Sequence, residues 1–209
     1  MGSLEVITGC MFSGKTTELF RRIRLAQLAR PKDTSVVYRP SLDTRSEAAA
    51  THDGVTYTSV TCRSSQDILF HLQAHPLIRV VGIDEVQFFD AGVIVVCKQL
   101  QSKAYRVIAT GLNQDFRGEP FRFRDSPLDI GHLIALADDP KYMGDAICMF
   151  PENDAICGKT AHRTQRLFLS GQPVPYDDPL IHPGGKNPLQ GRRYEARCLE
   201  HHFVPGRPG

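Results

Sequence analysis

Short apolar runs alternate with longer amphipathic segments over the first two thirds of the chain. The apolar runs predict strands at 4–8, 35–38, 79–85 and 105–110. Helical spacing and capping residues predict helices from 17 to before Pro31, and over 64–72, 91–102 and 129–136. Continuously apolar strands that alternate with helices are typical of a parallel sheet covered on both faces. We therefore expect an α/β fold.

The pattern changes after residue 137, where glycine, proline and aspartate become frequent. Two stretches there, 161–169 and 194–198, predict short strands. A polar, irregular stretch over 39–61 predicts a long loop within the first part. We therefore expect two units, an α/β domain over 1–140 and a small, loop-rich module over 141–209.

The clearest chemical signal lies between the first predicted strand and the first predicted helix. Residues 9–16 read Gly-Cys-Met-Phe-Ser-Gly-Lys-Thr, a complete G-x-x-x-x-G-K-[ST] phosphate-binding loop. Its glycines let backbone N–H groups converge on phosphate oxygens, Lys15 neutralises the outer phosphates, and the Thr16 hydroxyl ligates Mg²⁺. The alternative is a chance match to the motif. We expect the domain to bind Mg-ATP through the whole loop: Gly9, Cys10, Met11, Phe12, Ser13, Gly14, Lys15 and Thr16.

Two carboxylates end the predicted strand at 79–85. An acid at the end of a buried strand is the second signature of this class of nucleotide-binding protein, so Asp84 is expected to hold Mg²⁺ through its water shell. Glu85 is then positioned to take a proton from an attacking hydroxyl or water. The alternative is a solvated acidic pair that caps the next helix.

The cysteines predict a metal site in the module. Cys198 and His201 form a C-x-x-H pair, and Cys148 and Cys157 supply two more sulfurs with eight residues between them. Four such ligands from two loops suit a tetrahedral structural Zn²⁺, which stabilises a module with little core. The rival fourth ligands are His202 and His182, and buried thiols without metal are the alternative. The other three cysteines, Cys10, Cys62 and Cys97, are not clustered.

Composition limits the partners and the compartment. The formal net charge is +2, so no general attraction to nucleic acid or to an anionic membrane is expected. The basic residues Arg21, Arg22 and Arg24 predict a solvated helix face. The N-terminus enters a strand directly and no apolar run is long enough to span a bilayer, so we expect a soluble, cytoplasmic protein.

Together, these pieces resemble the zinc-containing, cytosolic (type II) thymidine kinases over nearly the whole chain. Residues 11–19 resemble the phosphate loop of that family, and Asp-Thr-Arg at 43–45 with Thr-His-Asp at 51–53 is similar to its second loop signature. Asp-Glu-Val-Gln-Phe-Phe at 84–89 resembles its D-E-x-Q-F-F motif, which is far more specific than a phosphate loop alone. Segments 157–167 and 194–198 resemble its zinc-module strands.

The resemblance implies a RecA-like P-loop sheet with flanking helices, followed by a zinc module that carries a lasso loop at about 178–194. It implies transfer of the ATP γ-phosphoryl group to the 5′-hydroxyl of thymidine, with Glu85 as general base. Asp43, Arg45 and Gln87 would join the ATP site. The thymine pocket would be lined by Met11, Phe88, Leu112, Phe116, Thr164, Ile181, Gly184 and Tyr194. The family is usually a homotetramer, commonly inhibited by its end product, thymidine triphosphate.

Three features depart from the family pattern: Cys10 stands where proline is frequent, the Cys148–Cys157 spacing exceeds C-x-x-C, and the lasso is longer than usual. Two other functions compete with the kinase. One is a nucleic-acid-stimulated ATPase whose zinc module grips the strand, which the balanced charge and the lack of an aromatic–basic stripe disfavour. The other is a nucleotide-sensing protein without turnover, which does not need Glu85.

Overall fold

A six-stranded parallel sheet forms the centre of the protein. The computed structural model describes residues 1–42, 49–50, 56–57, 59–124, 126–144, 146–180 and 191–208. The sheet order is β5-β2-β6-β7-β1-β8, and every neighbouring pair is parallel. Its strands are β1 (Ser3–Thr8), β2 (Thr34–Pro40), β5 (Ser59–Cys62), β6 (Ile78–Ile83), β7 (Arg106–Gly111) and β8 (Asp139–Tyr142).

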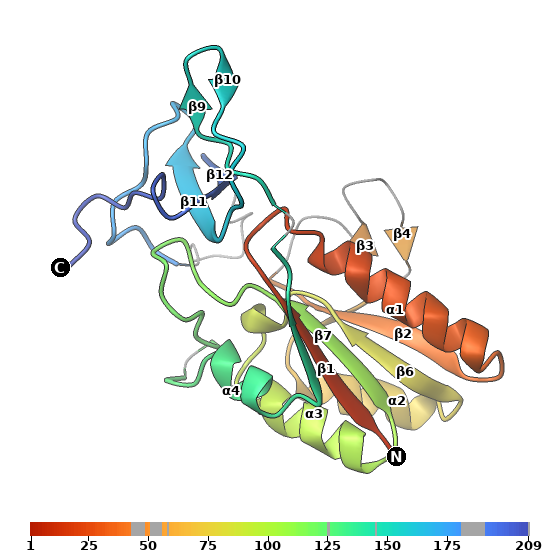
Figure 1. Ribbon diagram of the computed structural model, residues 1–209. Helices are drawn as coiled ribbons and strands as arrows, with labels where there is room; N and C mark the ends of the chain where they lie inside the picture. The colour runs from red at the N-terminus through yellow and green to blue at the C-terminus, as the bar shows by residue number, and fades with distance from the viewer. Residues whose placement is uncertain are drawn as a thin grey trace.

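Helices cover both faces of this sheet (Figure 1). Helix α1 (Lys15–Ala29) lies on one face, and α2 (Gln66–Ala74), α3 (Gly92–Ser102) and α4 (Ile130–Ala135) lie on the other. Successive residues of a strand point to opposite faces, so Val6 of β1 joins the core beneath α2, α3 and α4, while Ile7 joins the core beneath α1. The predicted doubly covered α/β sheet is confirmed.

Two strands of this sheet, β5 and β8, have no counterpart among the predicted strands. Strand β5 lies in the stretch expected to be loop, and β8 begins at Asp139 in a stretch of prolines and acids. Both are edge strands, and β8 is largely exposed, so neither needs the apolar run by which a buried strand is recognised. The division of the chain at residue 140 stays a prediction, and β8 extends to Tyr142.

A smaller module follows the sheet. It contains the hairpin β9 (Pro151–Glu152) and β10 (Ala155–Ile156), and the antiparallel pair β11 (Arg163–Phe168) and β12 (Arg192–Arg197). A further two-residue pair, β3 (Ala49–Ala50) and β4 (Thr56–Tyr57), lies between β2 and β5 in the chain. The module lies beyond the end of the sheet that carries the start of α1 (Figure 1).

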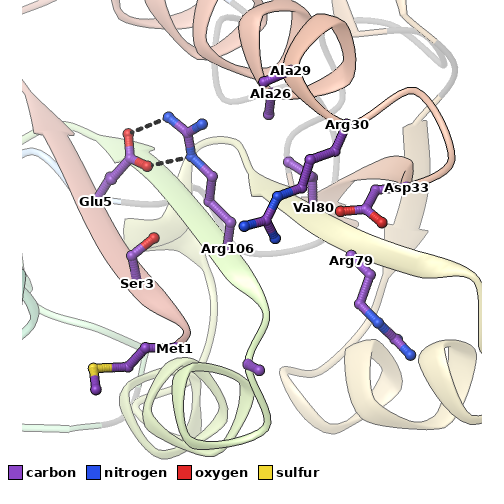
Figure 2. A pocket seen from close by; sticks show the side chains of 11 residues that line it. Met1, Ser3, Glu5, Ala26, Ala29, Arg30, Asp33, Arg79, Val80 and Arg106 are labelled. Carbon is purple, nitrogen blue, oxygen red and sulfur yellow. Dashed lines mark hydrogen bonds and ion pairs between the residues drawn. The ribbon is translucent and has the colours of Figure 1, made fainter.

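An ion-pair network ties α1 to the sheet. Glu5 of β1 accepts hydrogen bonds from Arg22 Nη1 of α1 and from Arg106 Nε of β7, both at 2.6 Å. Figure 2 shows the Glu5–Arg106 pair beside a cavity of about 530 Å³ near the amino end of β1, which Arg30 and Asp33 also line. Arg22 also contacts Glu18 and Asp139, so one buried guanidinium joins three carboxylates from α1, β1 and β8.

Within the described part of the chain, no helix is long and apolar enough to cross a bilayer.

Candidate active site

The phosphate loop connects β1 to α1 and depends on two glycines. A Cβ on Gly9 would lie 2.5 Å from Met143 O and 2.6 Å from Ser13 Oγ, so a side chain does not fit there. Gly14, the residue before α1, has φ 80°, in the left-handed region that favours glycine. The close approach and the left-handed turn give the loop its curled shape, with the N-terminus of α1 at its end.

Side-chain donors of the loop converge on one of its own carbonyls. Lys15 Nζ donates to Cys10 O at 2.6 Å, and Ser13 Oγ donates to the same oxygen at 2.8 Å. Lys15 is 8% exposed, so its ammonium group is held at the loop and not in open solvent. The lysine of a phosphate-binding loop is expected to neutralise phosphate charge, and this contact keeps its ammonium group at the loop.

The Mg²⁺ ligands expected from the sequence lie together. Thr16 Oγ1, in the first turn of α1, is 3.3 Å from Asp84 Oδ1, just after β6. Thr110 Oγ1 donates to the same Asp84 oxygen at 2.6 Å. Strands β6 and β7 pair Ile83 with Ala109, which makes residues 84 and 110 neighbours at the carboxyl edge of the sheet. Carboxylate and hydroxyl oxygens at one edge are a donor set that fits Mg²⁺.

Glu85 has an unusual backbone conformation. Its φ is 52° and ψ is 45°, in the left-handed region, which is uncommon for a residue with a side chain. Gln87 Nε2 donates to Glu85 Oε2 at 2.6 Å, and Gln87 Oε1 accepts from Leu112 N at 3.1 Å. Gln87 is 1% exposed and therefore orients Glu85 by bridging it to the chain after β7.

Direct contacts join the module to the phosphate loop. Met11 N donates to Thr164 Oγ1 of β11 at 3.0 Å. Cys10 forms a small buried cluster with Ala146, Ala161 and Ala196, and its thiol donates to Ala161 O at 3.5 Å. The unusual cysteine at position 10 is therefore a packing contact with the module.

The aromatic residues expected around thymine lie in two groups. Phe88 packs edge-on against Phe121, with ring centres 5.5 Å apart. Phe116, 2% exposed, lies beneath the Arg166 guanidinium, whose Cζ is 4.0 Å from the ring centre. The same guanidinium faces the Tyr194 ring at 5.4 Å, because β11 and β12 pair Arg166 with Tyr194.

The four expected zinc ligands come together, with their ligand atoms all within 4.8 Å of one another: Cys148, Cys157, Cys198 and His201. His201 Nδ1 lies 3.6 Å from Cys148 Sγ and 3.4 Å from Cys198 Sγ. A tetrahedral Zn²⁺ with bonds of about 2.3 Å to sulfur and about 2.0 Å to nitrogen separates such ligands by about 3.5 Å. The donor set therefore fits zinc in chemistry and spacing.

The long spacing between the first two cysteines is accommodated by the β9–β10 hairpin. At its base, Cys157 N donates to Phe150 O at 2.8 Å and Gly158 N donates to Cys148 O at 3.1 Å, which returns Cys157 to Cys148. The hairpin also supports His201. Phe150 stacks on the imidazole with ring centres 4.2 Å apart, and Glu152 Oε1 lies 3.4 Å from His201 Nε2. A carboxylate on Nε2 leaves Nδ1 as the ligand atom.

Of the rival histidines, His202 has another partner. Its Nε2 lies 2.9 Å from Phe116 O, and burial lowers the pKa of its imidazole. His202 therefore anchors the module to the chain that follows β7.

Comparison with known proteins identifies the family. The family model for thymidine kinase matches residues 2–202. A thymidine kinase from Coprothermobacter proteolyticus is 43% identical over 208 residues, which cover 99% of this chain and 93% of that relative. The chain belongs to the thymidine kinase family.

Two solved structures resemble this thymidine kinase family member only weakly. The Legionella pneumophila ATPase DotB matches with a TM-score of 0.38 and 20% identity, over 54% of this chain and 31% of DotB. The Pif1 helicase from Candida albicans matches with a TM-score of 0.38 and 14% identity, over 68% of this chain and 36% of the helicase. With TM-scores below 0.5, neither likeness adds to the assignment.

Five residues named from the sequence lie outside the described residues: Asp43 and Arg45 of the expected ATP site, Ile181 and Gly184 of the expected thymine pocket, and His182, the second rival zinc ligand. In turn, the structure shows three side chains that the sequence did not single out. Thr110 contacts Asp84, Glu152 contacts His201, and Arg166 contacts Phe116 and Tyr194. Each is adjacent to a predicted residue through strand pairing or a hairpin, which a motif in one segment does not reveal.

Proposed function

We propose that this protein is an ATP-dependent thymidine kinase, which transfers the γ-phosphoryl group of ATP to the 5′-hydroxyl of thymidine and yields ADP and thymidine monophosphate. The observation that carries the proposal is the thymidine kinase family match over 2–202, since it spans both the phosphate loop and the cysteine module. The positions of Asp84, Glu85 and Thr16 at one edge of the sheet support it.

In this mechanism, the loop residues 9–16 bind the phosphates of ATP through their backbone N–H groups. Lys15 adds a positive charge, and Thr16 and Asp84 would hold Mg²⁺, which would supply charge neutralisation at the transferring phosphoryl group. Thr110 orients the Asp84 carboxylate by donating to one of its oxygens. Among the residues outside the described ranges, Asp43 and Arg45 are proposed to act at the phosphates as well.

Glu85 is proposed to be the general base. It removes the proton from the 5′-hydroxyl of thymidine as the oxygen attacks the γ-phosphorus, and the hydrogen bond from Gln87 holds one carboxylate oxygen in place. We assign Gln87 to orienting this base, in addition to the ATP-site role inferred from the family. The thymine base is proposed to lie among the residues inferred for its pocket: Met11, Phe88, Leu112, Phe116, Thr164, Ile181, Gly184 and Tyr194.

The zinc module is proposed to be structural. Cys148, Cys157, Cys198 and His201 would hold one Zn²⁺, which joins the β9–β10 base to the end of β12 and stabilises a unit with a small apolar core. By covering the nucleoside, this module would exclude water that Glu85 could otherwise activate. A homotetramer, inhibition by thymidine triphosphate and a cytoplasmic location are further proposals that rest on the family.

The test is phosphoryl transfer from ATP with Mg²⁺ to each of the four deoxynucleosides in parallel. We expect thymidine monophosphate from thymidine and no comparable product from deoxyadenosine, deoxyguanosine or deoxycytidine. Folded protein that binds ATP but transfers to no nucleoside contradicts the proposal. ATP hydrolysis that single-stranded DNA stimulates would then favour the motor function.

A further inference from the structure

Arg166 lies in β11, two residues after Thr164. Residues two apart in a strand share a face. Thr164 uses this face to accept a hydrogen bond from Met11 N in the phosphate loop. Arg166 is 3% exposed, so the long side chain is enclosed between the module and the chain that follows β7.

The guanidinium group of Arg166 holds three consecutive residues by hydrogen bonds. Its Nη1 donates to Asp178 Oδ2 at 2.9 Å and to Pro179 O at 2.6 Å, and its Nη2 donates to Leu180 O at 2.8 Å. Because both nitrogens of the rigid fork are used, the segment 178–180 is fixed in distance and orientation relative to β11. Arg192 adds a second bond to Asp178 at 2.8 Å.

The planar faces of the same guanidinium contact two aromatic rings. Its Cζ lies 4.0 Å from the Phe116 ring centre and 5.4 Å from that of Tyr194. A planar cation against aromatic rings is attracted by their π-electrons and fixes their relative positions. Phe116 and Tyr194 are two of the residues proposed above to line the thymine pocket. Arg166 therefore connects three separate parts of the chain at that pocket.

This arrangement is not the one that maximises stability. Arg166 and Asp178 have side chains that are 4% and 6% exposed, and a buried ion pair of this kind contributes little more than apolar residues of the same size. Arg166 Nε is also buried without a hydrogen-bond partner among the described residues, which lowers stability further. The geometry that the fork and the rings impose gives a reason for a charge at this position.

We propose that Arg166 is a positioning residue for the nucleoside: it sets the affinity for thymidine and the discrimination against deoxyuridine, and leaves the transfer step to Asp84 and Glu85. This inference rests on the proposed function. A pocket wall held at three points keeps one fixed shape, which can match a base with a methyl group. When the wall loosens, the apolar contact with that methyl group weakens, and thymidine loses its advantage over deoxyuridine.

The test uses Arg166→Lys, which keeps the charge but removes the fork and most of the ring contact. We expect the KM for thymidine to rise by about tenfold or more, as for the loss of one or two buried hydrogen bonds. The KM for ATP should stay within about twofold and kcat within about threefold, and the ratio of kcat/KM for thymidine over deoxyuridine should fall. The control is Arg193→Lys in β12, whose side chain is 51% exposed, and which should leave all four values unchanged.

A second variant makes the result independent of one substitution. Asp178→Asn removes the ion pair from the other side, and its effect on the KM for thymidine should not add to that of Arg166→Lys in the double variant. Zinc content and ATP binding report whether each variant is folded. If Arg166 has only a structural role, Arg166→Lys should raise the KM for ATP and the KM for thymidine equally, or leave the KM for thymidine normal in folded protein. Either result overturns the proposal. Failure of the proposed function is recognised separately, because then the unmodified protein does not phosphorylate thymidine.

Discussion

Glu5→Gln tests how much the ion-pair network beneath α1 contributes to stability. The substitution keeps the shape of the side chain and removes its charge. In the native protein this carboxylate accepts hydrogen bonds from Arg22 and Arg106 at 2.6 Å each. The side chains of Glu5 and Arg22 are 10% and 9% exposed, so the pair is largely withdrawn from water.

The expected loss follows from what the two arginines retain. Removing one partner of a buried ion pair destabilises a protein by about 3–5 kcal/mol, because the other charge stays buried. Here Arg22 keeps Glu18 and Asp139, and Arg106 is 37% exposed and can be solvated. We therefore expect a loss nearer 2–3 kcal/mol in the free energy of unfolding. In a chain of 209 residues, each kcal/mol lost lowers the Tm by about 2–4 °C, so we expect the Tm to fall by about 4–12 °C.

Thermal melting at one fixed scan rate, followed by far-UV circular dichroism, measures this loss. The matched control is Asp33→Asn, which makes the same chemical change in the same cavity (Figure 2). Among the described residues Asp33 forms no ion pair, so its Tm should change by no more than about 2 °C. If the Tm of the Glu5→Gln protein is no lower than that of the Asp33→Asn protein, the network does not stabilise the fold and the reasoning is wrong.

Three further predictions concern catalysis, pH and zinc. Glu85→Gln should retain ATP binding while transfer to thymidine falls by about 10²–10⁴-fold, measured as kcat; near-normal turnover would assign the base elsewhere. The Arg21 hydrogen bond is the main reason why the pKa of Glu18 is lowered to about 2, against its usual 4.5, so its contribution to stability is complete above pH 4.5 and is lost as the pH falls toward 2. Urea midpoints of the native protein and Glu18→Gln should differ at pH 6 and converge at pH 2. Glu152→Gln should weaken zinc binding by about 10–100-fold in competition with a chelator, and an unchanged affinity would remove Glu152 from the support of His201.

The buried parts of the fold could be predicted because their apolar pattern is local. The strands over 4–8 and 105–110 and the helix over 91–102 correspond closely to β1, β7 and α3. Strand β8 could not be predicted, because an edge strand of Asp, Pro, Lys and Tyr carries no apolar signal, and pairing with β1 alone determines it. The hairpin at 151–156 was hidden for the same reason, since all four of its strand residues are exposed.

The candidate site shows the same limit. The phosphate loop and the Asp84–Glu85 pair are continuous in the sequence and carry their chemistry in a motif. Thr110 and Arg166 act through partners far away in the chain, and their positions follow from strand register. The left-handed backbone of Glu85 was also not predictable, because glutamate has no local preference for this conformation.

The β9–β10 hairpin bears on how the length of a metal-binding loop can vary among relatives. Backbone hydrogen bonds seal its base next to Cys148 and Cys157, so residues can be added or lost at the tip without moving either sulfur. Phe150 stacks on His201 at this base, and Glu152 reaches back from the hairpin to the same imidazole. Relatives with a shorter loop are thus expected to keep all four ligands but to draw the partner of the histidine from another segment. The two properties, ligand spacing and ligand support, can therefore diverge independently.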